Sequence, residues 1–198
     1  MSKKRDLTKK FWITLLIVFL VLIILSAVGF GLFANREDRV IIQEENGGDI
    51  ILNYSSNVAG LRITNSVPTT AAVGMKKSEA GDYFDFSVDV TLDNAASIEY
   101  DISVIKDTKN STISDSDIRI YLEQEQSGTY TAIFEPAKFT PLKADNEFGS
   151  KAGSMVIAHI KKTKSSTDHY RLRLWLSDES VIEKGNYTVE IAINGSSK

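Results

Sequence analysis

The chain has 198 residues, of which 42% are hydrophobic and 25% charged, with a formal net charge of −3 at pH 7. This acidic balance excludes a strongly basic nucleic-acid-binding domain. The sequence contains no cysteine, which excludes disulfide bonds, a thiol nucleophile and any cysteine-ligated zinc or iron–sulfur site. The hydrophobic fraction is sufficient for most of the chain to fold as a globular domain.

Charge is divided unevenly along the chain. Residues 1–34 hold five basic residues against Asp6, a sum of +4, whereas residues 35–198 hold 18 basic and 25 acidic residues, a sum of −7. A basic head ahead of an acidic body predicts that the two parts lie in different environments.

The first predicted element is a membrane span. Residues 11–34 form an uninterrupted run of 24 residues without a charge. As a helix this run is about 36 Å long, enough to cross a bilayer core of about 30 Å. We therefore predict a single transmembrane helix at 11–34, preceded by a cytoplasmic basic tip at 1–10. The basic flank predicts a cell-membrane protein with its N-terminus in the cytoplasm and residues 35–198 outside the cell.

A cleaved signal peptide is the alternative to an uncleaved signal anchor. The apolar region of a signal peptide is usually about 7–15 residues long, so the length of 11–34 favours the anchor. Small residues before Asn35 nevertheless leave cleavage after Ala34 open, although Leu32 is larger than the residue preferred three positions before such a cut.

Beyond the span, apolar and polar residues alternate with the period of a half-buried strand. Turn signals such as Asn46-Gly47-Gly48 and Lys184-Gly185-Asn186 separate the alternating segments. Eight or nine such strands predict antiparallel pairing into an immunoglobulin-like or jelly-roll β-sandwich at 60–198, preceded by a membrane-proximal segment at 35–59. Two alternating segments, 40–43 and 50–54, lie in the membrane-proximal part, and those in the predicted sandwich are 61–64, 84–92, 98–104, 118–122, 130–134, 155–160, 170–176 and 187–193.

One stretch in the predicted sandwich lacks both helical and strand periodicity. It covers residues 136–153 and holds two of the three prolines. Connections longer than about 12–15 residues tend to be functional or disordered. We predict a partly ordered loop here, which is the place where a surface hydrolase would carry its site.

Residues that could bind a metal are few. The two histidines, His159 and His169, flank a predicted hairpin between 155–160 and 169–176, where they could meet near a carboxylate as zinc ligands. The plainer interpretation, two surface histidines, is the one we adopt, with no metal predicted. The oxygen-rich runs 115–117 and 145–147 lack the spacing of an EF-hand, and a looser surface calcium site is left open.

Motifs for catalysis are missing. The sequence has no HExxH, no GxSxG and no phosphate-binding glycine loop. We therefore predict a protein that is not an enzyme, with no catalytic residue, no cofactor and no small-molecule substrate.

Three segments follow the basic tip and the apolar span in a familiar order: YFDFSVDVTLDNAASIEYDISV, then MVIAHIKKTKSSTDHYRLRLWLSDES, then NYTVEIAING. Over about residues 60–194 the chain resembles the TasA/camelysin-like membrane-anchored or secreted β-sandwich surface proteins of Firmicutes. TasA-like members are fibre subunits of the biofilm matrix whose leader is removed, so the resemblance implies assembly at the cell surface. Camelysin has been assigned a metalloprotease activity, for which this sequence supplies no ligand set.

The strand at 170–176 has one apolar side and one mixed side. Arg171, Arg173 and Trp175 share the mixed side, and we predict that they form a partner-binding face, because arginine and tryptophan are enriched at interface hot spots. The alternative is that Trp175 caps a sheet edge or packs under a loop.

These observations predict a non-enzymatic, single-pass bacterial cell-surface protein. Its outer β-sandwich mediates interaction or assembly with other surface proteins or with itself, and nucleic acid is not a partner. Two alternatives stay open: a cleaved, secreted biofilm-fibre subunit, and a surface hydrolase with a loop site at 136–153.

Overall fold

The computed structural model describes residues 39–44, 48–54, 60–79, 81–93, 95–181 and 184–197, all of which belong to the compact unit Glu37–Lys198. The predicted basic tip at 1–10 and transmembrane helix at 11–34 lie outside the described residues. Within the described ranges, no helix has the length and apolar character needed to cross a membrane.

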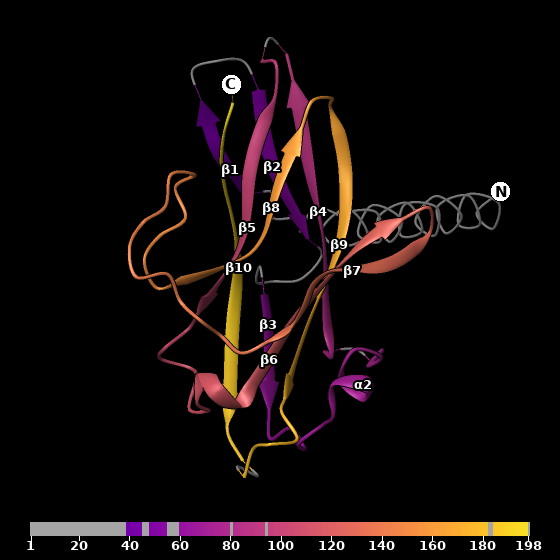
Figure 1. Cartoon of the computed structure of the whole chain (residues 1–198), viewed down its shortest axis with the longest axis vertical. Coiled ribbons are helices and arrows are strands. Elements are labelled where there is room, and N and C mark those ends of the chain that lie inside the picture. Colours follow the sequence, from indigo (N-terminus) through magenta and orange to yellow (C-terminus); the bar gives the residue numbers. More distant parts are fainter. Residues whose placement is uncertain are drawn as a thin grey trace, which may run out of the picture. The chain divides into compact units, whose positions relative to one another are not determined.

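The described part of the chain is all-β and forms two antiparallel sheets, as predicted (Figure 1). A six-stranded sheet has the order β1 (Arg39–Glu44), β2 (Gly48–Tyr54), β4 (Tyr83–Leu92), β9 (Ser166–Leu176), β6 (Ile118–Gln126) and β7 (Thr129–Ala137). A four-stranded sheet has the order β3 (Gly60–Thr64), β10 (Asn186–Ser197), β5 (Ile98–Lys106) and β8 (Ser154–Lys162). Helical structure in the described ranges consists of α2 (Ala71–Gly74) and the 3-10 turn η1 (Asp115–Asp117).

Each of the ten alternating segments lies within one of these strands, because period-two patterning is a local property of a pleated chain with one buried face. In β4, for example, Phe84, Phe86, Val88 and Val90 are each at most 5% exposed. They belong to one apolar core that draws buried side chains from both sheets, and the molecule is therefore a β-sandwich.

Two strands of the six-stranded sheet come from the segment predicted to be membrane-proximal, 35–59. β2 pairs with β4 along its whole length, from Gly48 opposite Leu92 to Tyr54 opposite Phe86. Its inward side chains are part of the core. β1 pairs with β2 and lies at the edge of the sheet.

The pairing of the strands is nested. β3 pairs with β10, β4 with β9, β5 with β8 and β6 with β7, all antiparallel. Strands that are distant in the sequence therefore lie side by side, as where Leu61 stands opposite Val189.

The predicted hairpin between 155–160 and 169–176 is wrong. β8 pairs with β5 in the four-stranded sheet, whereas β9 pairs with β4 and β6 in the six-stranded sheet. The short connection between them crosses from one sheet to the other, so His159 and His169 are not neighbours across a hairpin. A turn within a sheet and a turn between two sheets have the same local residue preferences, so the turn residues could not reveal the change of sheet.

One strand, β5, is buried on both faces. Ile98, Tyr100, Ile102 and Val104 face the core, as the alternation predicts. The alternate positions should face solvent, yet Glu99, Asp101 and Ser103 are 9%, 1% and 0% exposed. The loop at 138–153, which connects β7 to β8, is hydrogen-bonded to Asp101 and Ser103 on this outer face and explains their burial.

Candidate functional site

The face predicted from the sequence has Arg171 at its accessible end. The Arg171 guanidinium carbon lies 4.1 Å from the ring centre of Tyr83 and 4.3 Å from that of Tyr130. Its Nε and Nη2 atoms donate hydrogen bonds of 2.7 Å each to the two carboxylate oxygens of Asp85. The Asp85 carboxylate raises the pKa of Arg171 above its usual value. We call these four residues the Arg171 clamp.

The clamp connects four neighbouring strands. Tyr83 and Asp85 come from β4, Arg171 from β9, and Tyr130 from β7 on the far side of β6. Asp85 and Arg171 stand opposite each other in the register of β4 and β9. Antiparallel pairing therefore places the acid beside the base, and the two tyrosine rings enclose the planar guanidinium.

The other two residues of the predicted face are covered. Arg173 is 6% exposed and donates from Nε to Glu123 at 3.0 Å. Trp175 is 1% exposed and packs edge-on against Tyr121, with ring centres 6.4 Å apart. Gly74 of α2 lies directly over the indole, since a Cβ atom on this glycine would come within 2.4 Å of the Trp175 ring. Of the three, Arg171 alone keeps appreciable exposure, with 20% of its side chain accessible beside the two tyrosine rings.

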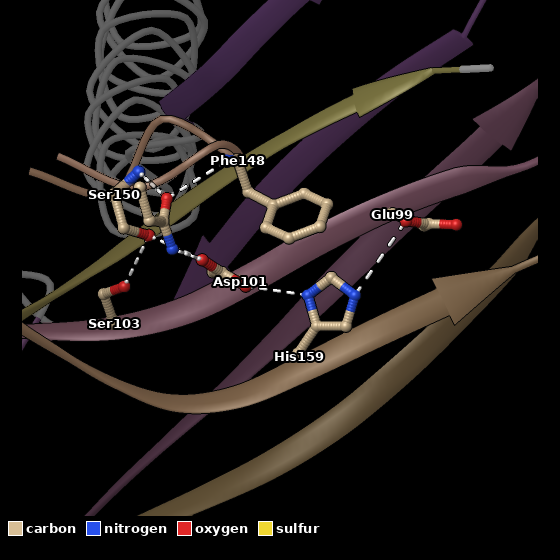
Figure 2. Close-up of polar contacts among 7 residues, drawn as sticks. Glu99, Asp101, Ser103, Phe148, Ser150 and His159 are labelled. Carbon is tan, nitrogen blue, oxygen red and sulfur yellow. Dashed lines mark hydrogen bonds and ion pairs between the residues drawn. The ribbon is translucent and has the colours of Figure 1, made fainter.

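A second polar cluster lies on the other sheet, at the outer face of β5 (Figure 2). Its centre is the Asp101 carboxylate. Oδ1 lies 2.8 Å from Nδ1 of His159, which stands opposite Asp101 on β8. Oδ2 accepts hydrogen bonds from Asn146 Nδ2 at 2.6 Å and from Ser150 Oγ at 2.9 Å. Three donors compensate the burial of this charge, which would otherwise cost several kcal/mol.

The second nitrogen of His159 faces outward. Nε2 lies 4.0 Å from a carboxylate oxygen of Glu99, whose other oxygen accepts a hydrogen bond from Lys161. The Phe148 ring covers one side of the imidazole, with ring centres 4.3 Å apart (Figure 2). The His159 side chain is 43% exposed. A buried carboxylate that orients an imidazole in this way is common where the outer nitrogen binds a metal or transfers a proton.

The cluster lacks the further groups that either chemistry needs. Across the described residues, no group of three or more histidine, cysteine or acidic side chains is placed to hold a metal, and His169 lies on β9, in the other sheet. Ser150 is fully buried and donates to Asp101 rather than to the imidazole. What the geometry does is hold the loop at 138–153 against β5.

The first acid of each oxygen-rich run is paired with groups of the protein itself. Asp115 accepts hydrogen bonds from Lys106 at 2.5 Å and from the Tyr187 hydroxyl at 2.8 Å. Asp145 accepts from the Ala152 backbone N–H at 2.9 Å and pairs with Lys151 at 3.0 Å. These two contacts lower the pKa of Asp145.

Sequence analysis did not single out Glu99, Asp101 or Ser150. Both carboxylates occupy ordinary outward positions of an alternating strand, where acids usually face water. The signal that could have pointed to them is the neighbouring loop. A long segment without secondary structure must satisfy its backbone groups through side chains, and Asn146 Oδ1 does so by accepting from the backbone N–H groups of Phe148 and Ser150.

Comparison with known proteins gives only distant likenesses. No family model and no curated protein matches the chain. Solved structures with some similarity include infectious bursal disease virus Gt strain, with a TM-score of 0.31 and 8% identity over 82% of this chain and 33% of that chain. AvmM, described as catalysing macrocyclization in alchivemycin A biosynthesis, has a TM-score of 0.29 and 12% identity, over 72% of this chain and 90% of that chain. The PA14 domain of the MpAFP antifreeze protein has a TM-score of 0.26 and 11% identity, over 73% of this chain and 65% of that chain.

This chain thus spans about a third of the viral chain that it matches. All three TM-scores are below 0.5, and they carry no argument about function.

Proposed function

We propose that this chain is a non-enzymatic, single-pass surface protein whose extracytoplasmic β-sandwich binds another protein through the Arg171 clamp. The observation that carries the proposal is the clamp itself. Tyrosine and arginine are the residue types that dominate interface hot spots. Here their side chains are already stacked and hydrogen-bonded in one arrangement, so a partner would lose little affinity to the ordering of these groups.

The charge balance of the clamp also suits burial in an interface. The paired hydrogen bonds to Asp85 neutralise Arg171 within the protein. An ion pair costs less to desolvate than a lone charge. Asp85 remains 42% exposed, and it is the part of the clamp that a partner's donor would meet first.

The experiment that tests this role uses a photo-crosslinking residue placed beside the clamp in the full-length chain. Ala132 is exposed on β7, two positions from Tyr130 and therefore on the same side of the strand. Thr131 is exposed and points to the opposite side, which makes it the matched control. We expect a discrete crosslinked protein from position 132 on intact cells and none from position 131.

Arg171→Lys keeps the charge but loses the planar double hydrogen bond and the stacking, so the product from position 132 should disappear in that variant. A product of equal yield with and without Arg171→Lys would contradict the proposal.

We further infer that the sandwich is a jelly roll rather than an immunoglobulin-like fold. Support comes from the nested pairing of β3 with β10, β4 with β9, β5 with β8 and β6 with β7, because wrapping one long hairpin into two sheets produces a jelly roll. Membership of the TasA/camelysin-like proteins rests on the sequence resemblance alone.

The proposed location rests on the basic tip at 1–10 and the uncharged run at 11–34. Protease added to intact producing cells should remove the β-sandwich while leaving a cytoplasmic control protein untouched. A sandwich that stays protected until the membrane is permeabilised would place it on the other side.

The alternative of a secreted fibre subunit has one structural observation in its favour. β1 lies at the edge of the six-stranded sheet, and an edge strand has unpaired backbone groups that can accept a strand from another chain. The mass of the mature protein decides between the two, because cleavage after Ala34 removes 34 residues from a 21.9 kDa chain.

A further inference from the structure

The outer face of β9 continues beyond the Arg171 clamp under a cover. Arg173 and Trp175 follow Arg171 at alternate positions of the strand and so point to the same side. Tyr83 joins the two parts, because its ring centre lies 4.1 Å from the guanidinium carbon of Arg171 and 5.6 Å from that of Arg173. The clamp and the covered pair are therefore one continuous row of side chains.

Within the described residues, the buried part of this row holds two donors without acceptors, and residues of α2 lie over one of them, the Trp175 indole. Nη1 of Arg173 and Nε1 of Trp175 are both buried and have no hydrogen-bond partner in the described part of the chain. Both atoms are donors, so neither can satisfy the other. A buried donor without an acceptor costs about 1–3 kcal/mol. The segment above them contributes Gly74, which packs on the indole without supplying a side chain.

The cover is also weakly held. α2 has four residues, no side-chain hydrogen bond at its N-cap, no acid in its first turn and no base in its last. Isolated helices of this length are unstable in water. Among the described residues, two backbone hydrogen bonds connect residues 65–79 to the sandwich. The Thr69 N–H donates to the Leu176 carbonyl at 2.9 Å, beside the isolated bridge to Ser177, and the Asn65 N–H donates to the Gly185 carbonyl at 2.8 Å. Val67 and Val73 in the same segment are 75% and 58% exposed, so they gain little from the covered state.

We propose that residues 65–79, with α2, are a displaceable cover over the Trp175 end of the binding face, next to the buried guanidinium of Arg173. The segment of the partner that replaces α2 carries an acidic side chain, whose oxygens accept hydrogen bonds from Arg173 Nη1 and Trp175 Nε1. This inference rests on the proposed function, and it adds the chemistry of the partner and the means by which the site is kept closed.

The test follows the indole N–H of Trp175 by NMR. The chain has two tryptophans, so tryptophan labelled with ¹⁵N in the full-length protein, solubilised in detergent, gives two indole signals, and Trp12→Phe assigns them. If the cover opens locally, the Trp175 indole should exchange its hydrogen at least about tenfold faster than the core amides of β5 and β10, which are followed in a second sample labelled uniformly with ¹⁵N. If the indole hydrogen of Trp175 exchanges only as fast as global unfolding allows, the proposal of a displaceable cover is wrong.

A matched pair of variants checks the cause. Gly74→Ala adds a Cβ against the Trp175 ring and should speed indole exchange at least about tenfold. Ala72→Ser, on the exposed side of the same helix, should change it less than about twofold. Equal changes in the indole exchange rate in the two variants would also contradict the proposal of a displaceable cover.

The acceptor site is tested with sodium acetate as the probe of a carboxylate. Acetate should move the Trp175 indole signal to lower field in a saturable way, and Gly74→Ala should lower the concentration needed for half the shift. Sodium chloride at the same ionic strength is the control. If acetate shifts the Trp175 indole signal no more than chloride does, the proposal that a carboxylate binds these donors is wrong. Because no partner protein is present, these outcomes are independent of the crosslinking test of the clamp.

Discussion

Two tyrosine hydroxyls meet in the middle of the core. Tyr100 on β5 and Tyr170 on β9 come from different sheets, and their hydroxyl oxygens lie 3.0 Å apart. Both side chains are fully buried. One hydroxyl donates to the other across the sandwich, so each has a hydrogen-bond partner although both are buried.

This pair leads to a non-additive prediction. Tyr100→Phe or Tyr170→Phe alone leaves one buried hydroxyl without its partner and should lower the free energy of unfolding by about 1–3 kcal/mol. The double variant removes both hydroxyls and should cost less than the sum of the single changes. Urea denaturation of the four proteins measures the coupling. Strictly additive losses would mean that the two hydroxyls do not act as a pair.

Neighbouring residues of β4 should differ sharply in their tolerance of substitution. Phe86 is 4% exposed and stacks on Tyr170, with ring centres 5.2 Å apart. Phe86→Asp places a lone charge in the core and should unfold the domain, since that burial costs several kcal/mol. Asp85→Ala should keep the fold and lose about 0.2–1 kcal/mol, because its pair with Arg171 is partly exposed. Far-UV circular dichroism and thermal melting distinguish the two outcomes, and equal behaviour would contradict the register of β4.

At the scale of elements, the loop at 138–153 and β5 depend on each other. The loop excludes water from Asp101 and Ser103, while Asp101 supplies the acceptor that holds Asn146 and Ser150. Ser103 and Ser150 add a contact of 3.0 Å between their hydroxyl oxygens. The loop is therefore ordered by side-chain hydrogen bonds rather than by a strand ladder.

Asn146→Ala should release this loop without unfolding the sheets. The substitution removes a donor to Asp101 and an acceptor for two backbone N–H groups. Hydrogen exchange should speed up at least about tenfold at 140–153 and stay unchanged in β10. Glu147→Ala, at the exposed neighbouring position, is the matched control. Uniform acceleration throughout the molecule would show instead that the loop and the sandwich unfold as one unit.

The β1–β2 hairpin is also tied to the rest of the sandwich. Ile50, Leu52 and Tyr54 of β2 are at most 4% exposed, and they cover the inward side chains of β4. A fragment that begins after residue 54 would expose that part of the core. Aggregation of such a fragment would then reflect lost packing, and it could not be taken as assembly by strand addition.

For the molecule as a whole, the buried tyrosines predict alkaline lability. Burial raises the pKa of Tyr100, Tyr170 and Tyr187 above the usual value of about 10. Below about pH 10 these phenols are neutral in both the folded and the unfolded state, so their full contribution to the free energy of unfolding is present. Above it they ionise only in the unfolded chain, and stability is lost as the pH rises.

The expected loss is about 1.4 kcal/mol per pH unit for each tyrosine that stays neutral in the fold. Urea midpoints measured between pH 9 and about pH 11 give the slope, and absorbance of the phenolate reports ionisation. The double Phe variant at positions 100 and 170 should show a shallower slope. Ionisation of all seven tyrosines at about pH 10 while the protein remains folded would contradict the assignment of Tyr100, Tyr170 and Tyr187 to the core.

The sequence alone was sufficient to locate the strands and their buried faces. Every alternating segment became a strand, and Phe84, Phe86, Val88 and Val90 entered the core as the pattern predicts. The reason is local: successive side chains of an extended chain point to opposite sides, whatever the strand pairs with. The same locality explains why Arg171, Arg173 and Trp175 could be assigned to one face.

Tertiary structure decided what lies against each face. β8 and β9 lie in different sheets, which separates His159 from His169. The tertiary structure also placed the loop over Asp101, and α2 over Trp175, leaving Arg171 open. Each of these outcomes depends on contacts between residues distant in the chain. An outward side chain has the same local sequence pattern whether water or another segment covers it, and only the packing of the whole chain distinguishes the two.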